Sequence, residues 1–132
     1  MKYIINIATG REPDMDKRSL RYQAGTDQRV FRDTYYLMDR KDGPPKRLSQ
    51  GYTTVYPNGT TTGHYHDDME EIYFFISGEG IMEVGEDKFP VKAGDACYVP
   101  PGQFHNTYQT GLYPLVILWT TCLIDGDETS AE

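Results

Sequence analysis

Short strand-like segments separated by turn signals follow one another from residue 30 to residue 121. The segments are rich in Val, Ile, Thr and aromatic residues, which favour strands, and none is longer than ten residues. Between them lie runs in which Gly, Pro, Asn and Asp favour turns: "KDGPP", "PNGT", "SGEG", "GED", "KAGD", "PPGQ" and "TGLYP". Nine segments are predicted as strands: "VFRDTYYLM", "RLSQGYTTVY", "TGHYH", "EIYFFIS", "GIMEV", "KFPV", "ACYVP", "HNTYQT" and "LVILWTT".

So many short strands in one chain predict an all-β fold, a single-domain antiparallel β-barrel or sandwich, because closing a sheet removes its exposed strand edges. The 132 residues suffice for one domain with its own core. Within this fold, "SGEG" is predicted to form a tight hairpin turn that joins "EIYFFIS" to "GIMEV".

The two ends of the chain depart from this strand-and-turn pattern. Residues 1–47 are predicted to form an N-terminal arm of the same domain, with "YIINI" as a short strand and "DMDKRSLRYQ" as one or two helical turns. Residues 48–122 are predicted to form the core of the domain. Residues 123–132 include "DGDETSAE", which has four acidic and no large apolar side chains, and we expect a disordered acidic tail there.

Composition argues against nucleic-acid and membrane partners. The net charge of -7 opposes general binding to phosphate backbones, and no apolar run approaches the roughly 20 residues that cross a bilayer. The N-terminal apolar stretch is too short for a signal peptide, so we expect a cytoplasmic protein. Cys97 and Cys122 are the only cysteines and lie far apart, so both are expected to be free thiols in a reducing compartment.

Charge is distributed unevenly along the chain. Residues 1–50 carry eleven of the thirteen basic side chains and seven acidic ones, whereas residues 51–132 carry two basic and thirteen acidic side chains. A basic arm is therefore expected to lie on an acidic body, either its own or that of a partner subunit. A basic ligand-binding stripe in the arm is the alternative. The apolar segments "YIINI" and "LVILWTT" add hydrophobic surface, and together these features predict a homodimer.

Only three histidines occur, and two of them lie two residues apart. On an extended strand, His64 and His66 project to the same side while Tyr65 points to the opposite face. Glu71 heads the next apolar strand, and His105 follows "PPGQF" at the start of another. A lone histidine is usually an ordinary hydrogen-bonding residue, but three imidazoles and one carboxylate form a ligand set for a divalent transition metal. One such metal per chain is predicted.

The spacing of these residues resembles the first conserved motif of the cupin family. That motif is a glycine, five residues, His-x-His, three or four residues, a glutamate, six residues and a glycine. The matching positions are Asn58, His64, His66, Glu71 and Gly78.

The second cupin motif follows after fifteen residues, a spacing typical of compact single-domain cupins. That motif is a glycine, five residues, Pro-x-Gly, two residues, a histidine, three residues and an asparagine. The matching positions are Gly94, Pro100, Gly102 and His105, with Gln109 in place of the asparagine. The resemblance spans about residues 50 to 120 and leaves residues 1–47 outside it.

Two positions depart from the family pattern, and two adjacent glutamates could each be the glutamate of the first motif. Asn58 replaces a glycine but tolerates the left-handed turn conformation, and Gln109 lies outside the ligand set implied by the family. Glu70 and Glu71 both follow His66 at a permitted distance. Only Glu71 leaves six residues before the second glycine of the motif, so it is the preferred ligand.

The resemblance implies a double-stranded β-helix of the jelly-roll type that holds iron, manganese, nickel, cobalt or zinc. The family's usual octahedral shell would leave two positions for water, oxygen or a bidentate substrate. Similar cupins include dioxygenases, decarboxylases, isomerases, lyases and cyclases. The expected function is therefore a metal-dependent enzyme acting on a small oxygenated organic molecule. The alternatives are a non-catalytic cupin that binds or senses a small ligand, and a structural or storage-like cupin.

Candidate catalytic residues follow from strand parity and chemistry. Tyr73 shares the face of Glu71 and is expected beside the metal, where a phenol can serve as acid, base or hydrogen-bond donor. Tyr52 and Cys97 are further candidates, although packing is the more common role of such residues in a small β domain. If the basic arm enters a neighbouring cavity, the cations that would contact the ligand are Arg29, Arg32 or Arg47.

Overall fold

The structure, a computed structural model, describes residues 3–11 and 29–124. Its fold is all-β, as predicted, and the helix in the described residues is a four-residue turn, α1 (Ile7–Gly10). The strands are β1 (Arg29–Val30), β2 (Arg32–Met38), β3 (Leu48–Val55), β4 (Gly59–Thr60), β5 (Met69–Ser77), β6 (Glu79–Val84), β7 (Asp87–Lys92), β8 (Ala96–Val99), β9 (His105–Thr110) and β10 (Leu115–Leu123).

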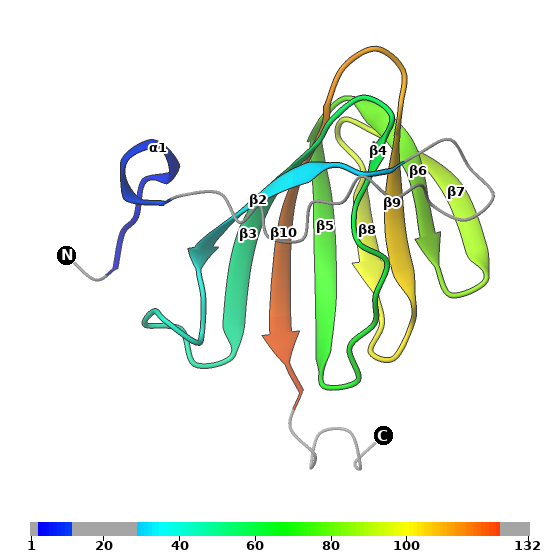
Figure 1. Cartoon of the computed structure of the whole chain (residues 1–132). Helices are drawn as coiled ribbons and strands as arrows, with labels where there is room; N and C mark the ends of the chain where they lie inside the picture. Colours follow the sequence, from blue (N-terminus) through cyan, green and yellow to red (C-terminus); the bar gives the residue numbers. More distant parts are fainter. Residues whose placement is uncertain (1–2, 12–28, 125–132) are drawn as a thin grey trace.

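The strands form two five-stranded sheets. One sheet has the order β2-β3-β10-β5-β8 and the other has the order β1-β4-β9-β6-β7. Figure 1 shows β2, β3, β10 and β5 on the left and β9, β6 and β7 on the right. All neighbouring strands pair antiparallel except β1 and β4, which are parallel. Closure of the two sheets into a barrel stays a prediction.

Alternation along each strand places an apolar core between the sheets. On β5, Phe75 is fully buried, whereas its neighbours Phe74 and Ile76 point outward and are exposed. Successive residues of a strand face opposite sides of a sheet, so one apolar segment can supply both surfaces. The buried apolar cluster consists of Val55, Tyr73, Phe75, Met82, Val91, Cys97, Val99, Leu115 and Ile117.

Eight of the nine predicted strands are present, and "TGHYH" is the exception. This segment makes a single bridge, between His64 and His105, instead of a strand. The predicted hairpin at "SGEG" is also wrong, because β5 pairs with β10 and β8 whereas β6 pairs with β7 and β9. The chain crosses from one sheet to the other at Gly78, which has φ 85°. A Cβ there would lie 2.3 Å from the Pro114 carbonyl oxygen, so only glycine fits this corner.

The N-terminal segment contributes to both sheets. β1 pairs with β4, and β2 pairs with β3 along most of its length. The prediction of a strand at "YIINI" is wrong, since residues 4–6 form no regular element and α1 begins at Ile7. The predicted helical turns at "DMDKRSLRYQ" and the predicted tail at 125–132 lie outside the described residues. In the part of the chain that is described, no helix has the length and apolar character needed to span a membrane.

Candidate metal centre

Backbone hydrogen bonds bring the three histidines together at one end of the space between the sheets. The amide of His64 donates to the carbonyl of His105 at 3.1 Å, and the amide of His105 donates to the carbonyl of His64 at 2.9 Å. The amide of Gly102 donates to the carbonyl of His66, which ties the "PPGQ" loop to the His-x-His segment. Two segments that lie about forty residues apart are thus held in register.

The side chains of these histidines converge with the carboxylate of Glu71. The imidazole centroids of His64 and His66 lie 4.7 Å apart, and those of His64 and His105 lie 4.2 Å apart. Glu71 Oε2 lies 3.1 Å from His105 Nε2, and Glu71 Oε1 lies 3.8 Å from His66 Nε2. One donor atom from each of the four residues lies within 4.8 Å of all the others.

Backbone carbonyls orient two of the imidazoles. His64 Nδ1 lies 2.6 Å from the carbonyl oxygen of Thr62, and His105 Nδ1 lies 3.2 Å from that of Gln103. A carbonyl oxygen only accepts hydrogen bonds, so each Nδ1 carries the hydrogen and each Nε2 is left with its lone pair. This outer contact is the usual way in which proteins orient metal-binding histidines.

The burial of the donor atoms fits a bound cation. Glu71 Oε2 and His105 Nε2 are both buried and have no hydrogen-bond partner among the described residues, although they lie only 3.1 Å apart. A buried carboxylate oxygen and a buried imidazole lone pair are costly when nothing satisfies them. Metal–ligand bonds of about 2.0–2.2 Å place two ligands at most roughly 4.4 Å apart, close to the spread seen here. The donor set therefore fits a divalent transition metal.

Burial also keeps the histidines in the form that a metal needs. Desolvation lowers the pKa of His64, and the neighbouring His105 and His66 lower it further, against the opposing effects of the Thr62 carbonyl and Glu71. Desolvation likewise lowers the pKa of His66, whereas the Glu71 carboxylate raises it. A neutral imidazole has the free lone pair that binds a metal.

A cavity of about 280 Å³ extends from the candidate metal centre between the sheets. Three of the four candidate ligands, His64, His66 and Glu71, line it. Among the described residues, threonine hydroxyls and aromatic rings form most of the remaining wall, and one cationic side chain, Arg32, lies in it. These further wall residues are Thr34, Thr53, Thr61, Thr62, Tyr36, Tyr73, Ile117 and Trp119.

A glycine makes room for the largest of these rings. Gly51 pairs with Trp119 across β3 and β10, and a Cβ at Gly51 would lie 1.9 Å from Trp119 Cζ2. The indole lies over the glycine, and its Nε1–H donates to Thr53 Oγ1 at 2.9 Å. The N–H of a partly buried indole usually has such a partner. The cavity wall at this point is therefore held by both packing and a hydrogen bond.

Of the three candidate catalytic residues, Tyr73 lines the cavity, whereas Tyr52 and Cys97 do not. Tyr73 lines the cavity, and its pKa is raised well above the ordinary value, mainly by burial and then by Glu71 and Cys97, while Arg32 opposes the shift. Tyr52 lies on the opposite face of β3 from Thr53.

Cys97 is buried beside β5, pairs with Tyr73 across the strands and is not part of the cavity wall. Burial raises the pKa of its thiol. Only Tyr73 among the three candidates therefore faces the candidate metal centre.

The two adjacent glutamates lie on opposite faces of β5. Glu71 points inward and is buried, whereas Glu70 is exposed and accepts a hydrogen bond from the Tyr98 hydroxyl at 2.9 Å. Glu70 Oε1 therefore takes part in a contact on the outer face of the sheet. Glu71 is the glutamate that joins the three histidines.

The polar wall that β2 supplies was not predicted from the sequence. Arg32, Thr34 and Tyr36 alternate along this strand and all face the cavity. The alternation of these residues is visible in the sequence, but polar side chains at every second position of a strand usually face solvent. Arg32 reaches the cavity of its own chain, whereas Arg29 and Arg47 are not part of the cavity wall.

Comparison with known proteins identifies relatives of the region that carries this site. The profile of the cupin domain family matches residues 51–121. An oxalate-binding protein of Thermotoga maritima is 35% identical over 69 residues, which are 52% of this chain and 57% of the relative. A glucose-6-phosphate isomerase of Thermococcus onnurineus is 37% identical over 93 residues, 61% of this chain and 48% of the relative. The chain thus spans about half the length of these relatives.

Solved structures show the same fold. A crystal structure from Thermotoga maritima, described as a predicted oxalate decarboxylase, superposes with a TM-score of 0.67 at 20% identity. The match covers 86% of this chain and 99% of that one. Oxalate decarboxylase from Bacillus subtilis superposes with a TM-score of 0.61 at 26% identity, over 68% of this chain and 25% of that one.

Proposed function

The chain belongs to the cupin domain family, and from this membership and its metal centre we propose that it is a metal-dependent enzyme. Its substrate is a small oxygenated organic molecule, and its metal is a divalent transition ion held by His64, His66, Glu71 and His105. The observation that carries the proposal is the convergence of four donor atoms within 4.8 Å, at the end of a cavity that can admit a ligand.

The size of the cavity supports a small substrate. Its volume of about 280 Å³ lies just below the roughly 300–1,000 Å³ of pockets that hold drug-sized ligands. Relatives of this chain bear the names of proteins that handle small, oxygen-rich molecules, namely oxalate and glucose 6-phosphate. The walls combine hydroxyl groups, which orient a polar ligand, with aromatic rings that exclude water.

Each group has a role in this proposal. A divalent metal held by the four ligands would act as a Lewis acid and polarise an oxygen atom of the substrate. Tyr73 is protonated at neutral pH, as phenols are, so its hydroxyl is a hydrogen-bond donor beside the metal centre. The Thr62 hydroxyl is buried without a hydrogen-bond partner among the described residues and lies in the cavity wall, where it can bind a polar group of the substrate.

Metal analysis of ligand variants tests the first half of the proposal. We expect about one divalent ion per chain in the purified protein, and a loss of that ion in His66→Ala and His105→Ala. Tyr65→Ala is the matched control, because Tyr65 lies between the two motif histidines but is exposed. Unchanged metal stoichiometry and affinity in both histidine variants would overturn the assignment of the site.

Turnover assays test the second half. The metal-loaded protein is incubated with keto acids, sugars and sugar phosphates, phenols and polyketide-like aromatics, and the products are analysed by mass spectrometry. A product that disappears in His66→Ala supports an enzyme. Tight binding without any product favours the second candidate, a cupin that binds a small ligand without turnover. The observation in favour of that candidate is the relative named an oxalate-binding protein.

A further inference from the structure

Trp119 lies on β10 and points into the space between the two sheets. It is the single tryptophan of the chain, and its indole forms part of the cavity wall. The side chain packs against the buried apolar cluster, yet it remains only partly buried. Because the ring both lines the cavity and keeps accessible surface, a molecule in the cavity can contact it.

Gly51 fixes the orientation of this indole. Gly51 pairs with Trp119 across β3 and β10, and a Cβ built on it would lie 1.9, 2.3 and 2.5 Å from three adjacent atoms of the six-membered ring. Such a Cβ would enter the ring through its face rather than meet its edge. Side chains stand roughly perpendicular to a sheet, so the indole lies flat against β3. Its other face is turned toward the cavity.

Two tyrosines flank the flat indole. The Tyr36 ring lies 5.6 Å from the Trp119 ring, centroid to centroid, at an interplanar angle of 82°. Tyr36 pairs with Gly51 from β2, so its ring stands upright beside the indole. Tyr73 pairs with Trp119 from β5 and also lines the cavity. The three rings form one aromatic row across the sheet, with the indole as its base.

This aromatic row lies next to the candidate metal centre. Glu71 precedes Tyr73 by two residues on the same face of β5, so it is a diagonal neighbour of Trp119 across the strand pair. Diagonal neighbours on a sheet are about 7–8 Å apart. The Tyr73 ring also lies 6.1 Å from the imidazole of His105, at 88°. The space between the indole and the metal donors is therefore about the size of one small ring.

We propose that the substrate contains a ring whose face stacks on the Trp119 indole, while oxygen atoms attached to that ring face the metal centre. Gly51 is the positioning residue, because only a residue without a Cβ lets the indole lie flat. An aromatic ring gains from offset stacking, and a saturated ring such as a sugar can lay an apolar C–H face on the indole. The inference rests on the proposed function, because it names the substrate class of the same site.

Three hydroxamates with the same metal-binding group test this inference. Acetohydroxamate has no ring, benzohydroxamate carries a flat aromatic ring, and cyclohexanecarbohydroxamate carries a saturated ring. Isothermal titration calorimetry of the zinc-loaded protein should show a ring-bearing probe binding at least about tenfold more tightly than acetohydroxamate. The tighter of the two ring-bearing probes distinguishes an aromatic substrate from a sugar-like one. Its binding should also change the fluorescence of Trp119, the single tryptophan.

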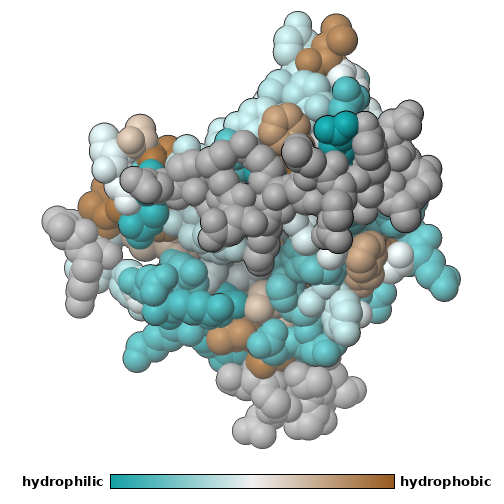
Figure 2. All heavy atoms as spheres, in the orientation of Figure 1, coloured by the Kyte–Doolittle hydropathy of each residue, from teal (hydrophilic) through white to brown (hydrophobic). Residues whose placement is uncertain are grey.

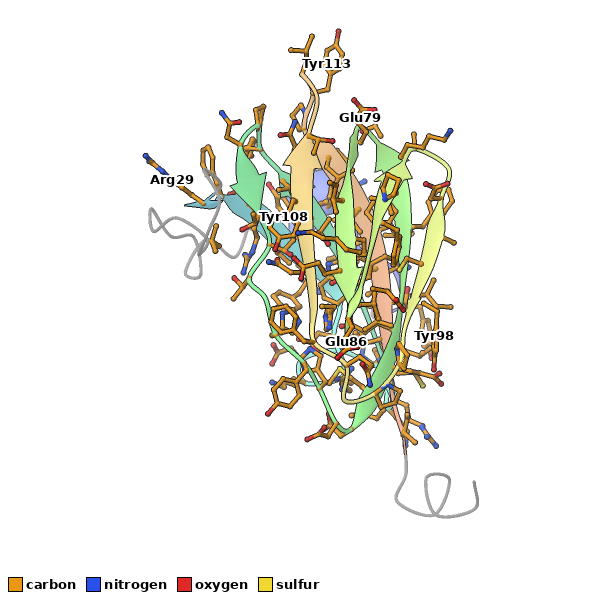
Figure 3. The ribbon with its side chains drawn as sticks, turned by 90° about the vertical axis from the view of Figure 1, so that its right-hand side faces the viewer. Arg29, Glu79, Glu86, Tyr98, Tyr108 and Tyr113 are labelled. Atoms are coloured by element: carbon orange, nitrogen blue, oxygen red, sulfur yellow. The ribbon has the colours of Figure 1, made fainter. Side chains whose placement is uncertain are left out.

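Substitution of the indole shows whether the preference arises there. Trp119→Leu should abolish the preference for a ring-bearing probe, and Trp119→Phe should restore part of it, since phenylalanine keeps a smaller ring. Tyr98→Leu is the matched control, because it also replaces an aromatic ring by leucine in the same sheet. Tyr98 is exposed, and Figure 3 shows it on the outside of the ribbon.

Substitution of the glycine separates positioning from direct contact. The methyl group of Gly51→Ala should push the indole off β3 and into the cavity, so ring-bearing probes should bind at least about tenfold more weakly. Acetohydroxamate should keep its affinity. In a Trp119→Leu background, Gly51→Ala should cause no further loss, because both substitutions act through the same ring. Circular dichroism and retained acetohydroxamate binding identify a folded variant, and if Gly51→Ala does not fold, the two Trp119 variants decide.

The possible outcomes separate this inference from the proposed function. If the metal-loaded protein binds the ring-bearing probes no more tightly than acetohydroxamate, or if Trp119→Leu keeps the preference, the ring site is wrong while the metal centre stands. If the chain takes up no metal but a ring-bearing probe still binds and changes the fluorescence of Trp119, the proposed metal enzyme fails while the ring site stands. A chain that binds neither metal nor any of the three probes overturns both.

Discussion

Two neighbouring glutamates illustrate how a one-residue difference decides chemistry at the residue scale. Glu70 and Glu71 have the same side chain, and both follow His66 at a spacing that the cupin motif permits. They nevertheless face opposite sides of β5. Glu71 is buried among three imidazoles, and Glu70 is exposed and hydrogen-bonded to Tyr98. A shift of one residue along a strand exchanges its two faces. The register of β5 therefore selects the carboxylate.

Conversion of each glutamate to glutamine tests this selection. Glu71→Gln removes the anionic donor while keeping its shape, and we expect metal affinity to fall by more than the roughly 10–100-fold found for outer-shell partners. Glu70→Gln changes only an exposed contact, and we expect it to keep its metal. Metal retention during chelator titration compares the two variants. The opposite order of retention would mean that the strand register is wrong by one residue.

The thiol of Cys97 should be inert at neutral pH. It is 7% exposed, and burial raises the pKa of the thiol above its ordinary value of 9.0. The thiolate is the reactive form, so a thiol-specific reagent should modify folded Cys97 much more slowly than unfolded Cys97. In a Cys122→Ser variant Cys97 is the only cysteine, so the reagent reports on Cys97 alone. Rapid modification of Cys97 in that folded variant at pH 7 would show an accessible, reactive thiol.

The same shift predicts a change of stability at high pH. The folded state favours the protonated thiol more than the unfolded state does. The contribution of Cys97 to the free energy of unfolding is therefore fully present below about pH 9. It is lost as the pH rises through the higher pKa of the folded state. Cys97→Ala should therefore unfold with a weaker dependence on pH above 9 than the unsubstituted protein.

At the scale of the element, β5 supplies side chains to the core, to the candidate metal centre and to the outer surface at once. Its inward set contains Glu71, Tyr73 and Phe75, and its outward set contains Phe74 and Ile76. Both sets are rich in apolar side chains, so the segment "EIYFFIS" does not reveal its buried face by hydropathy alone. The polar ligand Glu71 marks that face.

Two phenylalanine variants measure this asymmetry. Phe75→Ala should lower the free energy of unfolding by about 3–5 kcal/mol, because Phe75 is fully buried. Phe74→Ala should cost less than about 1 kcal/mol, because Phe74 is 44% exposed. Chemical denaturation at submicromolar concentration keeps any association from contributing. Equal losses in the two variants would contradict the observed alternation.

At the scale of the whole molecule, the outer face of the sheet β2-β3-β10-β5-β8 is unusually apolar. Phe74, Ile72, Ile76 and Tyr98 are exposed on it. One row of paired residues crosses all five strands and consists of Tyr35, Tyr52, Leu118, Phe74 and Ala96. A contiguous apolar face of this kind is typical of a protein–protein interface.

A small hydrophobic group also lies at one tip of the molecule. Figure 2 shows it over the loop that joins β9 to β10, at the top of the view, beside hydrophilic atoms. Leu112 and Tyr113 in this loop are 86% and 73% exposed. This tip is a single loop, whereas the apolar row of the outer face crosses five strands.

We propose that a second copy of the chain covers this outer face, and that the basic N-terminal segment helps to hold the homodimer. Sedimentation at micromolar concentration should give a dimer, and Phe74→Lys, which places a charge on the face, should give a monomer. A chain that starts at Gln28 tests the role of the N-terminal segment. A full-length monomer would end the dimer proposal, whereas a shortened chain that still dimerises would exclude only the role of the arm.

Local sequence patterns were enough to predict eight of the nine strands and the four residues that cluster at the candidate metal centre. Turn residues divide the chain into short segments, and local preference decides such elements. The spacing of His64, His66, Glu71 and His105 is likewise a property of the chain, and the structure brings these four together. The failures were local as well as global. "TGHYH" has the composition of a strand, but it forms only one bridge, between His64 and His105. Its composition does not decide how many of its residues pair with another strand.

How the two sheets share one cavity depends on contacts between segments that lie far apart in the chain. The apparent hairpin at Gly78 is a crossing between sheets, since a turn sequence does not specify which strands pair on either side of it. Arg32 became part of the site because β2 pairs with β3 and turns its polar alternate residues inward. Strand pairing between distant segments sets which face is buried, and that information resides in the packing of the whole molecule rather than in any single segment.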